Sequence, residues 1–262
     1  MLRQLAQVLR DRRQKPAMAS ADYWDDRAKT RSGFARSVWH SQSFSEAWDE
    51  RQQALLRDAL SLLDGGIAGR RVADVGCGTG RITRFLAKEG ARATGFDFSP
   101  ETVKVADEET RAAGLTAEFV VADATSGSLP VPDGTFDLSL AVGCLAVACR
   151  DLDALERALG AMRAATRAGG AVVLLEPIHD GRFFGRVLRE PVEGWVSAAR
   201  RAGLRLVDRR GMGLLPVRAA LSSVDAPPWL VRPLFAAGEG VLDTSAWLEP
   251  LADYRLLSFR VA

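Results

Sequence analysis

The 262-residue chain is poor in the residues that build metal and disulfide sites, with three cysteines and two histidines. Cys77, Cys144 and Cys149 form no C-x-x-C pair, and so few cysteines in a chain of this size indicate reduced thiols in a cytoplasm. No histidine, cysteine and carboxylate cluster has the spacing of metal ligands, so we predict no metal. The chain also lacks a G-x-S-x-G motif, which argues against a covalent serine nucleophile.

Net charge and long apolar runs are equally scarce. The net charge is +2, whereas a nucleic-acid-binding protein usually concentrates Lys and Arg on one face. No apolar run is long enough to span a membrane, and there is no secretory h-region. With 47% hydrophobic residues, the chain can bury a sizeable core as one domain with an appendage. The sequence therefore predicts a soluble, cytoplasmic protein without a nucleic-acid partner.

One stretch, residues 70–87, organises the rest of the chain, because it predicts a buried strand, a glycine turn and a helix. Gly76, Gly78 and Gly80 crowd into five residues, as happens where a backbone turns sharply and approaches a ligand. A dinucleotide fingerprint would place its third glycine where Arg81 stands, which disfavours an NAD-dependent enzyme. We therefore expect a ligand other than a dinucleotide at the N-terminus of this helix.

A carboxylate after the next predicted strand indicates what kind of ligand binds. Asp97 lies in the stretch ATGFDFSP, at the carboxyl end of a short strand. A carboxylate there can accept hydrogen bonds from both hydroxyls of a ribose. Together with the glycine turn, Asp97 predicts a nucleoside.

Five motifs in order resemble those of class I S-adenosylmethionine (SAM)-dependent methyltransferases. They are VADVGCGTG, GFDFSP, VVADAT, DGTFDLSLAV and RAGGAVVLLEP, and the resemblance covers roughly residues 60–178. It implies a Rossmann-like α/β fold: a seven-stranded, mostly parallel sheet with helices on both faces and an antiparallel C-terminal hairpin. The cofactor would be SAM, and its product S-adenosyl-L-homocysteine.

The resemblance also implies which residues bind the cofactor. Asp123 would accept a hydrogen bond from the adenine amine, although an Asx-type turn at a strand end is the alternative. The full set comprises the glycine turn, the residues after the second and third strands, and those at the end of the fourth: Asp74, Gly76, Cys77, Gly78, Gly80, Asp97, Phe98, Asp123, Ala124, Val142 and Gly143.

We predict that residues 1–63 form an N-terminal helical segment and lid, and residues 64–262 the SAM-binding domain. The basic, amphipathic first helix either docks on protein or lies on a membrane surface. The aromatic residues before residue 63 either close a lid that excludes water or simply pack it against the sheet. An apolar insertion at about 211–251 is expected to form the acceptor pocket, with an oligomer interface or a membrane-facing patch as alternatives.

The implied reaction is in-line SN2 transfer of a methyl group to a small-molecule acceptor, with a hydroxyl favoured over an amine or carbon. Orientation is the main contribution, since effective molarities reach roughly 10⁵ to 10⁸ M. A general base would add about 10² to 10⁴. The candidate catalytic residues are His179, with Glu176 or Asp180 orienting it, and His40 in the lid. Either histidine can equally be a surface or capping residue.

Alternatives to this function remain open. The acceptor can be a lipid, quinone or glycolipid head group met at a membrane surface, as the basic first helix and the apolar insertion suggest. The chain can also be a non-catalytic SAM-binding protein. Residues 142–145 replace the Asn/Asp-Pro-Pro-Tyr/Phe tetrapeptide of many N- and DNA-methylating relatives, which counts against a nucleic-acid amine. The identity of the acceptor and a homo-oligomeric state are not determined by the sequence.

Overall fold

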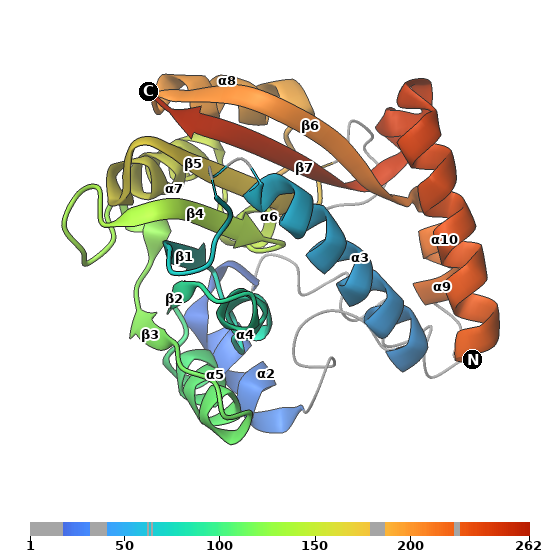
Figure 1. The fold of residues 1–262 in the computed structure, drawn as a ribbon, viewed down its shortest axis with the longest axis horizontal. Coiled ribbons are helices and arrows are strands. Elements are labelled where there is room, and N and C mark those ends of the chain that lie inside the picture. Colours follow the sequence, from blue (N-terminus) through green and yellow to red (C-terminus); the bar gives the residue numbers. More distant parts are fainter. Residues whose placement is uncertain (1–17, 32–40, 62, 64, 179–186, 223–225) are drawn as a thin grey trace.

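A seven-stranded sheet runs through the molecule (Figure 1). The structure, a computed structural model, describes residues 18–31, 41–61, 63, 65–178, 187–222 and 226–262. The strand order is β3-β2-β1-β4-β5-β7-β6. The strands are β1 (Arg71–Val75), β2 (Arg92–Asp97), β3 (Glu118–Val121), β4 (Phe136–Val142), β5 (Thr166–Glu176), β6 (Leu204–Leu214) and β7 (Ala252–Val261).

Strands β1 to β5 are parallel, whereas β7 pairs antiparallel with both β5 and β6. The predicted Rossmann-like sheet with antiparallel C-terminal strands is therefore confirmed. The division of the chain at residue 63 stays a prediction.

Helices flank this sheet, and short 3₁₀ turns lie in the connections. The helices are α2 (Ala21–Thr30), α3 (Gln42–Leu60), α4 (Arg81–Lys88), α5 (Pro100–Ala112), α6 (Leu145–Ala148), α7 (Leu152–Ala165), α8 (Val192–Arg201), α9 (Leu215–Ser222) and α10 (Pro228–Thr244), with the 3₁₀ turns η3 (Ala124–Ser126) and η4 (Ala246–Leu251). None of the described helices combines the length and the hydropathy needed to cross a membrane.

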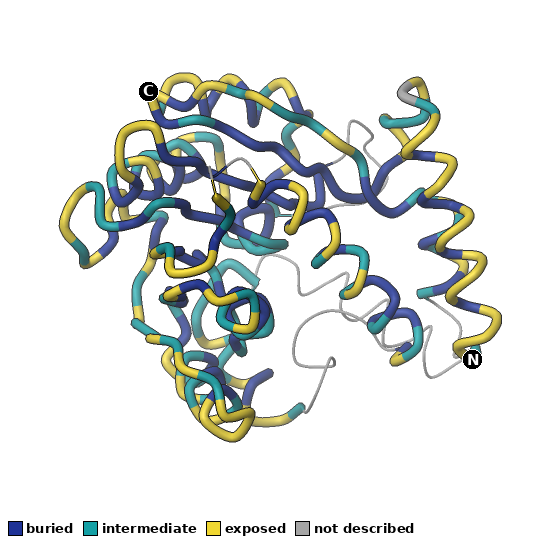
Figure 2. Tube along the Cα trace, in the orientation of Figure 1, coloured by how far each residue is buried: buried dark blue, intermediate teal, exposed yellow. Residues whose placement is uncertain are grey.

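Apolar side chains pack on both faces of the sheet, as expected where parallel strands are covered by helices. On β5, Val172 and Leu174 join the core formed with α7 and α8, whereas Val173 and Leu175 join the core formed with α3 and α4. This alternation follows the period of two of a strand. Figure 2 shows β5 and β7 as the buried centre of the molecule.

The segment between β6 and β7 is largely helical and lies beside α3 (Figure 1). Residues 211–214, which we expected to begin the insertion, belong to β6, so its helical part starts at Leu215. Arg51 of α3 holds α10 through Glu239 (Nε–Oε2 distance 2.9 Å) and Asp243 (Nη2–Oδ1 distance 2.5 Å). Helix α10 is thereby fixed next to the helix that covers the carboxyl edge of the sheet.

Candidate active site

The glycine turn connects β1 to α4 through three left-handed residues. Gly76, Gly78 and Gly80 have φ angles of 72°, 53° and 79°, which favour glycine over residues with a side chain. A Cβ atom at Gly76 would lie 2.4 Å from the side chain of Cys144, so this position also lacks space. The turn therefore depends on its glycines for both conformation and room.

Asp97 ends β2 and is almost fully buried. Its Oδ2 accepts a hydrogen bond from the backbone N–H of Gly78 at 2.8 Å, and Oδ1 accepts from the N–H of Ser99 and the hydroxyl of Thr102 at 2.9 and 3.1 Å. Burial raises the pKa of Asp97, and these hydrogen bonds oppose the rise. Because a carboxylate has about four acceptor positions, three donors leave capacity for a ribose hydroxyl.

Asp74 lies in β1 beside the turn and is also buried. Burial raises the pKa of Asp74 to about 6. A hydrogen bond from the Thr83 hydroxyl (O–O distance 2.6 Å) and the charge of Arg81 both act to lower this pKa. The charge of this carboxylate therefore changes close to neutral pH. When ionised, Asp74 provides a negative group in the lining of the pocket for a cationic ligand group.

Asp123 follows β3 and forms an Asx-type turn, which was the predicted alternative to a hydrogen bond with the adenine amine. Its Oδ1 accepts hydrogen bonds from the backbone N–H and hydroxyl of Thr125 at 2.9 and 2.7 Å. Among the described residues no hydrogen bond reaches Oδ2, and Asp123 lines the pocket. The turn therefore leaves an acceptor for the adenine amine, so the two interpretations are compatible.

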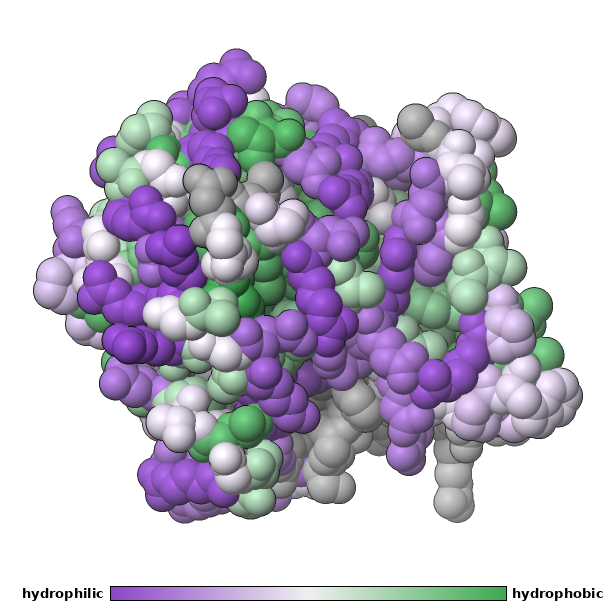
Figure 3. Space-filling view, viewed as in Figure 1, coloured by the Kyte–Doolittle hydropathy of each residue, from purple (hydrophilic) through white to green (hydrophobic). Residues whose placement is uncertain are grey.

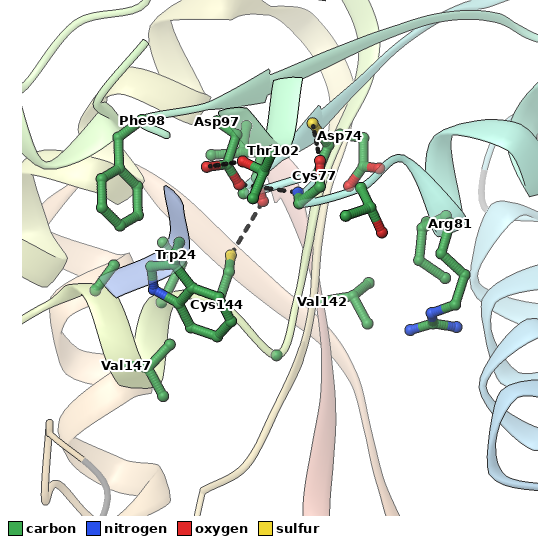
Figure 4. A pocket seen from close by; sticks show the side chains of 18 of the residues that line it. Trp24, Asp74, Cys77, Arg81, Asp97, Phe98, Thr102, Val142, Cys144 and Val147 are labelled. Carbon is green, nitrogen blue, oxygen red and sulfur yellow. Dashed lines mark hydrogen bonds between the residues drawn. The ribbon is translucent and has the colours of Figure 1, made fainter. Parts of the chain in front are cut away.

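A single pocket gathers the predicted cofactor residues at the carboxyl edge of the sheet (Figure 4). Gly80, the last glycine of the turn and the N-cap of α4, is not among its lining residues. The predicted residues that line the pocket are Asp74, Gly76, Cys77, Gly78, Asp97, Phe98, Asp123, Ala124, Val142 and Gly143.

Of the three candidate catalytic residues, the structure describes one. His40 and His179 lie outside the described residues. Glu176 is fully buried, and its carboxylate accepts the backbone N–H groups of Cys144, Leu145 and Ala146 at 3.0, 3.1 and 3.1 Å. Glu176 thus caps the N-terminus of α6, and burial raises its pKa. Its predicted role in orienting His179 stays a prediction.

Several pocket residues were not singled out from the sequence as cofactor or catalytic residues. Arg81 had only been noted as the replacement for a glycine, and Trp24 and Trp48 belonged to the aromatic segment without assigned roles. Asp49 and Gln52 of α3 and Tyr254 of β7 gave no signal in the sequence, because a helix face and a strand end do not reveal what they face. The pocket residues of this kind include Trp24, Ser45, Trp48, Asp49, Gln52, Arg81, Thr102 and Tyr254.

Metal binding was predicted to be absent. The part of the chain that the structure describes contains no group of three or more His, Cys, Asp or Glu residues able to hold a metal ion. That part excludes both histidines, so the absence of a metal stays a prediction.

Known proteins share this arrangement. The family model described as "Methyltransferase domain" matches residues 72–170. The ubiquinone biosynthesis O-methyltransferase of Methylococcus capsulatus is 33% identical over 173 residues, which cover 58% of this chain and 70% of that protein. The chain belongs to the class I SAM-dependent methyltransferases. The cofactor of this family is SAM, and the buried Asp97, the open oxygen of Asp123 and the glycine turn fit its adenosine half.

Two further proteins are similar to this chain. The demethylmenaquinone methyltransferase of Tropheryma whipplei is 35% identical over 132 residues, so the match spans 50% of this chain and only 52% of that protein. The solved structure of geranyl diphosphate C-methyltransferase from Streptomyces coelicolor A3(2) has a TM-score of 0.59 at 16% identity, covering 82% of this chain and 79% of that chain. This structural likeness shows the fold alone.

Proposed function

We propose that this methyltransferase transfers the methyl group of SAM to a planar aromatic small molecule of the quinone or phenol type, with a hydroxyl oxygen as the favoured acceptor. The observation that carries the proposal is the aromatic wall formed by Trp48 and Tyr254 in the cofactor pocket. One relative is named a ubiquinone biosynthesis O-methyltransferase and another a demethylmenaquinone methyltransferase, which supports the same class of acceptor.

The aromatic wall stands beside the end of β4. The Trp48 and Tyr254 rings pack edge to face, with centroids 5.1 Å apart. The Tyr254 hydroxyl lies 3.2 Å from the position that a Cβ atom of Gly143 would occupy. Since Gly143 is one of the predicted cofactor-binding residues, an acceptor ring on this wall would lie close to the bound cofactor.

Other aromatic rings pack against the aromatic wall and fix its position. Trp48 packs against Phe44 and Phe235 at centroid distances of 5.5 and 5.8 Å. Gly213 of β6 provides room for the indole, because a Cβ atom there would lie 2.5 Å from Trp48. A rigid aromatic surface restricts the acceptor to few orientations, and orientation is the main requirement of this chemistry.

When bound, SAM supplies an activated sulfonium methyl group, so this chain's residues chiefly bind and orient the two reactants. Asp97 and the glycine turn position the nucleoside, and Trp48 and Tyr254 position the acceptor. Trp24 of α2 lines the same pocket (Figure 4), where it would limit the access of water. Deprotonation of an acceptor hydroxyl is assigned to His179 or His40, as the sequence predicted.

The direct test incubates the purified protein with methyl-tritiated SAM and a reduced short-chain analogue, 2-geranyl-1,4-naphthoquinol, alongside a panel of catechols and simple amines. We expect label in the naphthoquinol or catechol products, and mass spectrometry with NMR identifies the methylated atom. Trp48→Ala should raise the KM for the acceptor while leaving SAM affinity nearly unchanged. Binding of S-adenosylhomocysteine without transfer to any compound would instead support a non-catalytic SAM-binding protein.

Exposed apolar side chains on the insertion favour a second candidate, an acceptor carried in a lipid membrane. Trp229 of α10 and Trp247 of η4 are 76% and 78% exposed, and Leu234 is 48% exposed. Figure 3 shows hydrophobic side chains along the edge of the molecule that α10 forms. Aromatic side chains of this kind partition to membrane interfaces.

Flotation with phosphatidylcholine–phosphatidylglycerol vesicles tests this candidate. The wild type should float with the vesicles, and the Trp229→Ala/Trp247→Ala variant should stay in the bulk. Val121→Ala is the matched control, because Val121 is 50% exposed but lies on β3. Equal flotation of all three proteins, or none, would reject a role of the insertion in membrane contact.

A further inference from the structure

Helix α10 of the insertion contacts the aromatic wall with one buried face. Phe235 and Glu239 lie one turn apart on this helix, and both are buried. The Phe235 ring packs against Trp48, and Glu239 lies next to Gly213, the residue that leaves room for the Trp48 indole. Because a buried carboxylate is costly to desolvate unless it is paired, the partners of Glu239 indicate what it holds in place.

Each carboxylate oxygen of Glu239 binds a different element of the fold. Oε1 accepts the backbone N–H of Gly213 of β6 at 2.8 Å, and Oε2 accepts the Nε–H of Arg51 of α3 at 2.9 Å. Trp48 depends on both attachments, because it precedes Arg51 by about one turn of α3 and its ring fills the space left by Gly213. Glu239 therefore fixes the helix that carries Trp48 relative to the strand that receives its ring.

A second buried ion pair joins the insertion to the other residue of the wall. Arg218 of α9 binds Asp253 of β7, with an Nε–Oδ2 distance of 2.6 Å, and Asp253 immediately precedes Tyr254. Asp253 also lies beside Gly213, because its Cβ atom is 3.5 Å from the position that a Cβ atom of Gly213 would occupy. Each residue of the wall thus adjoins a buried ionic contact made by the insertion.

We propose that Glu239 is a positioning residue for the acceptor, which it orients through Trp48 without touching the reactants. The proposal rests on the proposed acceptor class, and it gives the insertion an indirect role in acceptor binding. Trp48 and Tyr254 line the pocket, whereas none of the described residues of the helices α9 and α10 does. The insertion therefore shapes the acceptor site by fixing the wall and not by contact with the acceptor.

Glu239→Gln tests this role, because it keeps the shape of the side chain but replaces one acceptor oxygen with an NH₂ donor. The amide can then accept from Arg51 or from Gly213, but not from both. At saturating SAM, we expect the KM for 2-geranyl-1,4-naphthoquinol, or for the catechol that the wild type prefers, to rise at least fivefold. The Kd for S-adenosylhomocysteine, measured by calorimetric titration, should stay within twofold. A merely structural role would instead reduce the folded fraction, which lowers the apparent kcat and leaves KM unchanged.

Arg232→Gln is the matched control. Arg232 of α10 binds Glu50 of α3 at 2.9 Å, so this ion pair joins the same two helices as Glu239 and Arg51 do. Both of its side chains are exposed, and neither lines the pocket. We therefore expect the KM for the acceptor and the Kd for S-adenosylhomocysteine to stay within twofold of the wild type.

Arg51→Lys decides the question if Glu239→Gln fails to fold and binds no S-adenosylhomocysteine. A lysine ammonium keeps the charge but lacks the fork through which Arg51 holds Glu239, so the KM should rise at least threefold at unchanged Kd. An unchanged KM in the folded variant, or an equal rise in Arg232→Gln, would overturn the proposal. A wild type that binds S-adenosylhomocysteine but methylates no quinol or catechol would refute the proposed function, and the role of Glu239 with it.

Discussion

Gly78→Ala tests whether the glycine turn approaches the cofactor closely. Gly78 has a φ of 53°, and a Cβ atom there would meet no protein atom within 4 Å. Because Gly78 lines the pocket, the added methyl group would occupy ligand space rather than clash with the protein. An L-residue in the left-handed region costs about 1–2 kcal/mol, and about 1 kcal/mol lowers the Tm of a chain of this size by about 2–4 °C. We therefore expect a Tm about 2–8 °C lower.

Gly114→Ala provides the same backbone strain away from the pocket. Gly114 follows α5 with a φ of 67°, and a Cβ atom there would also meet nothing within 4 Å. The two variants should lose similar stability, as measured by differential scanning fluorimetry. Only Gly78→Ala should lose affinity for S-adenosylhomocysteine, by at least about tenfold, or about 1.4 kcal/mol.

The binding measurement is calorimetric titration of both variants and the wild type under one buffer condition. If Gly78→Ala binds S-adenosylhomocysteine within twofold of Gly114→Ala, the close backbone approach is wrong. A large loss of binding in Gly114→Ala would show that strain alone, and not occupancy of the pocket, explains the effect.

Three further predictions concern the buried carboxylates. Asp97→Ala should weaken SAM binding by about 1.5–3 kcal/mol in a titration, because it removes hydrogen bonds to a charged group, and unchanged affinity would remove Asp97 from the site. Because the pKa of Asp74 is about 6 and its ionised form attracts the ligand ammonium, affinity for S-adenosylhomocysteine should fall as the pH drops below about 6. Asp74→Asn should flatten that pH profile, and an unaltered profile would assign it to another group. Glu176→Gln should lower the free energy of unfolding in urea by about 1–3 kcal/mol, because it weakens the cap of α6; lost methyl transfer at full stability would instead support a catalytic role.

The adenosine half of the site was predictable because its signals are local. Each parallel strand delivers its last residues to the same edge of the sheet, and the register pairs Val75 of β1 with Phe96 of β2. The glycine turn after β1 and Asp97 after Phe96 therefore had to meet. Short motifs were sufficient for this part of the pocket, because backbone topology alone brings them together.

The opposite half depends on packing between elements that are distant in the sequence. Arg81 binds Asp49 and Gln52 only because α3 crosses above the start of α4. Tyr254 meets Trp48 only because β7 enters the sheet between β5 and β6. No residue spacing in α3 or β7 encodes these contacts, so the sequence predicted a lid without assigning its side chains.

Gly213 shows why the boundary of the insertion was misplaced. The stretch after Arg210 is rich in Pro, Gly and apolar residues, so it was assigned to the insertion, although glycine can also lie within a strand where another group approaches closely. In the structure β6 continues to Leu214, and Gly213, with a φ of 76°, leaves the space that Trp48 fills. A side chain there would displace the indole and, through it, Tyr254. The aromatic wall therefore requires glycine at position 213, and the acceptor half of the pocket depends on that wall.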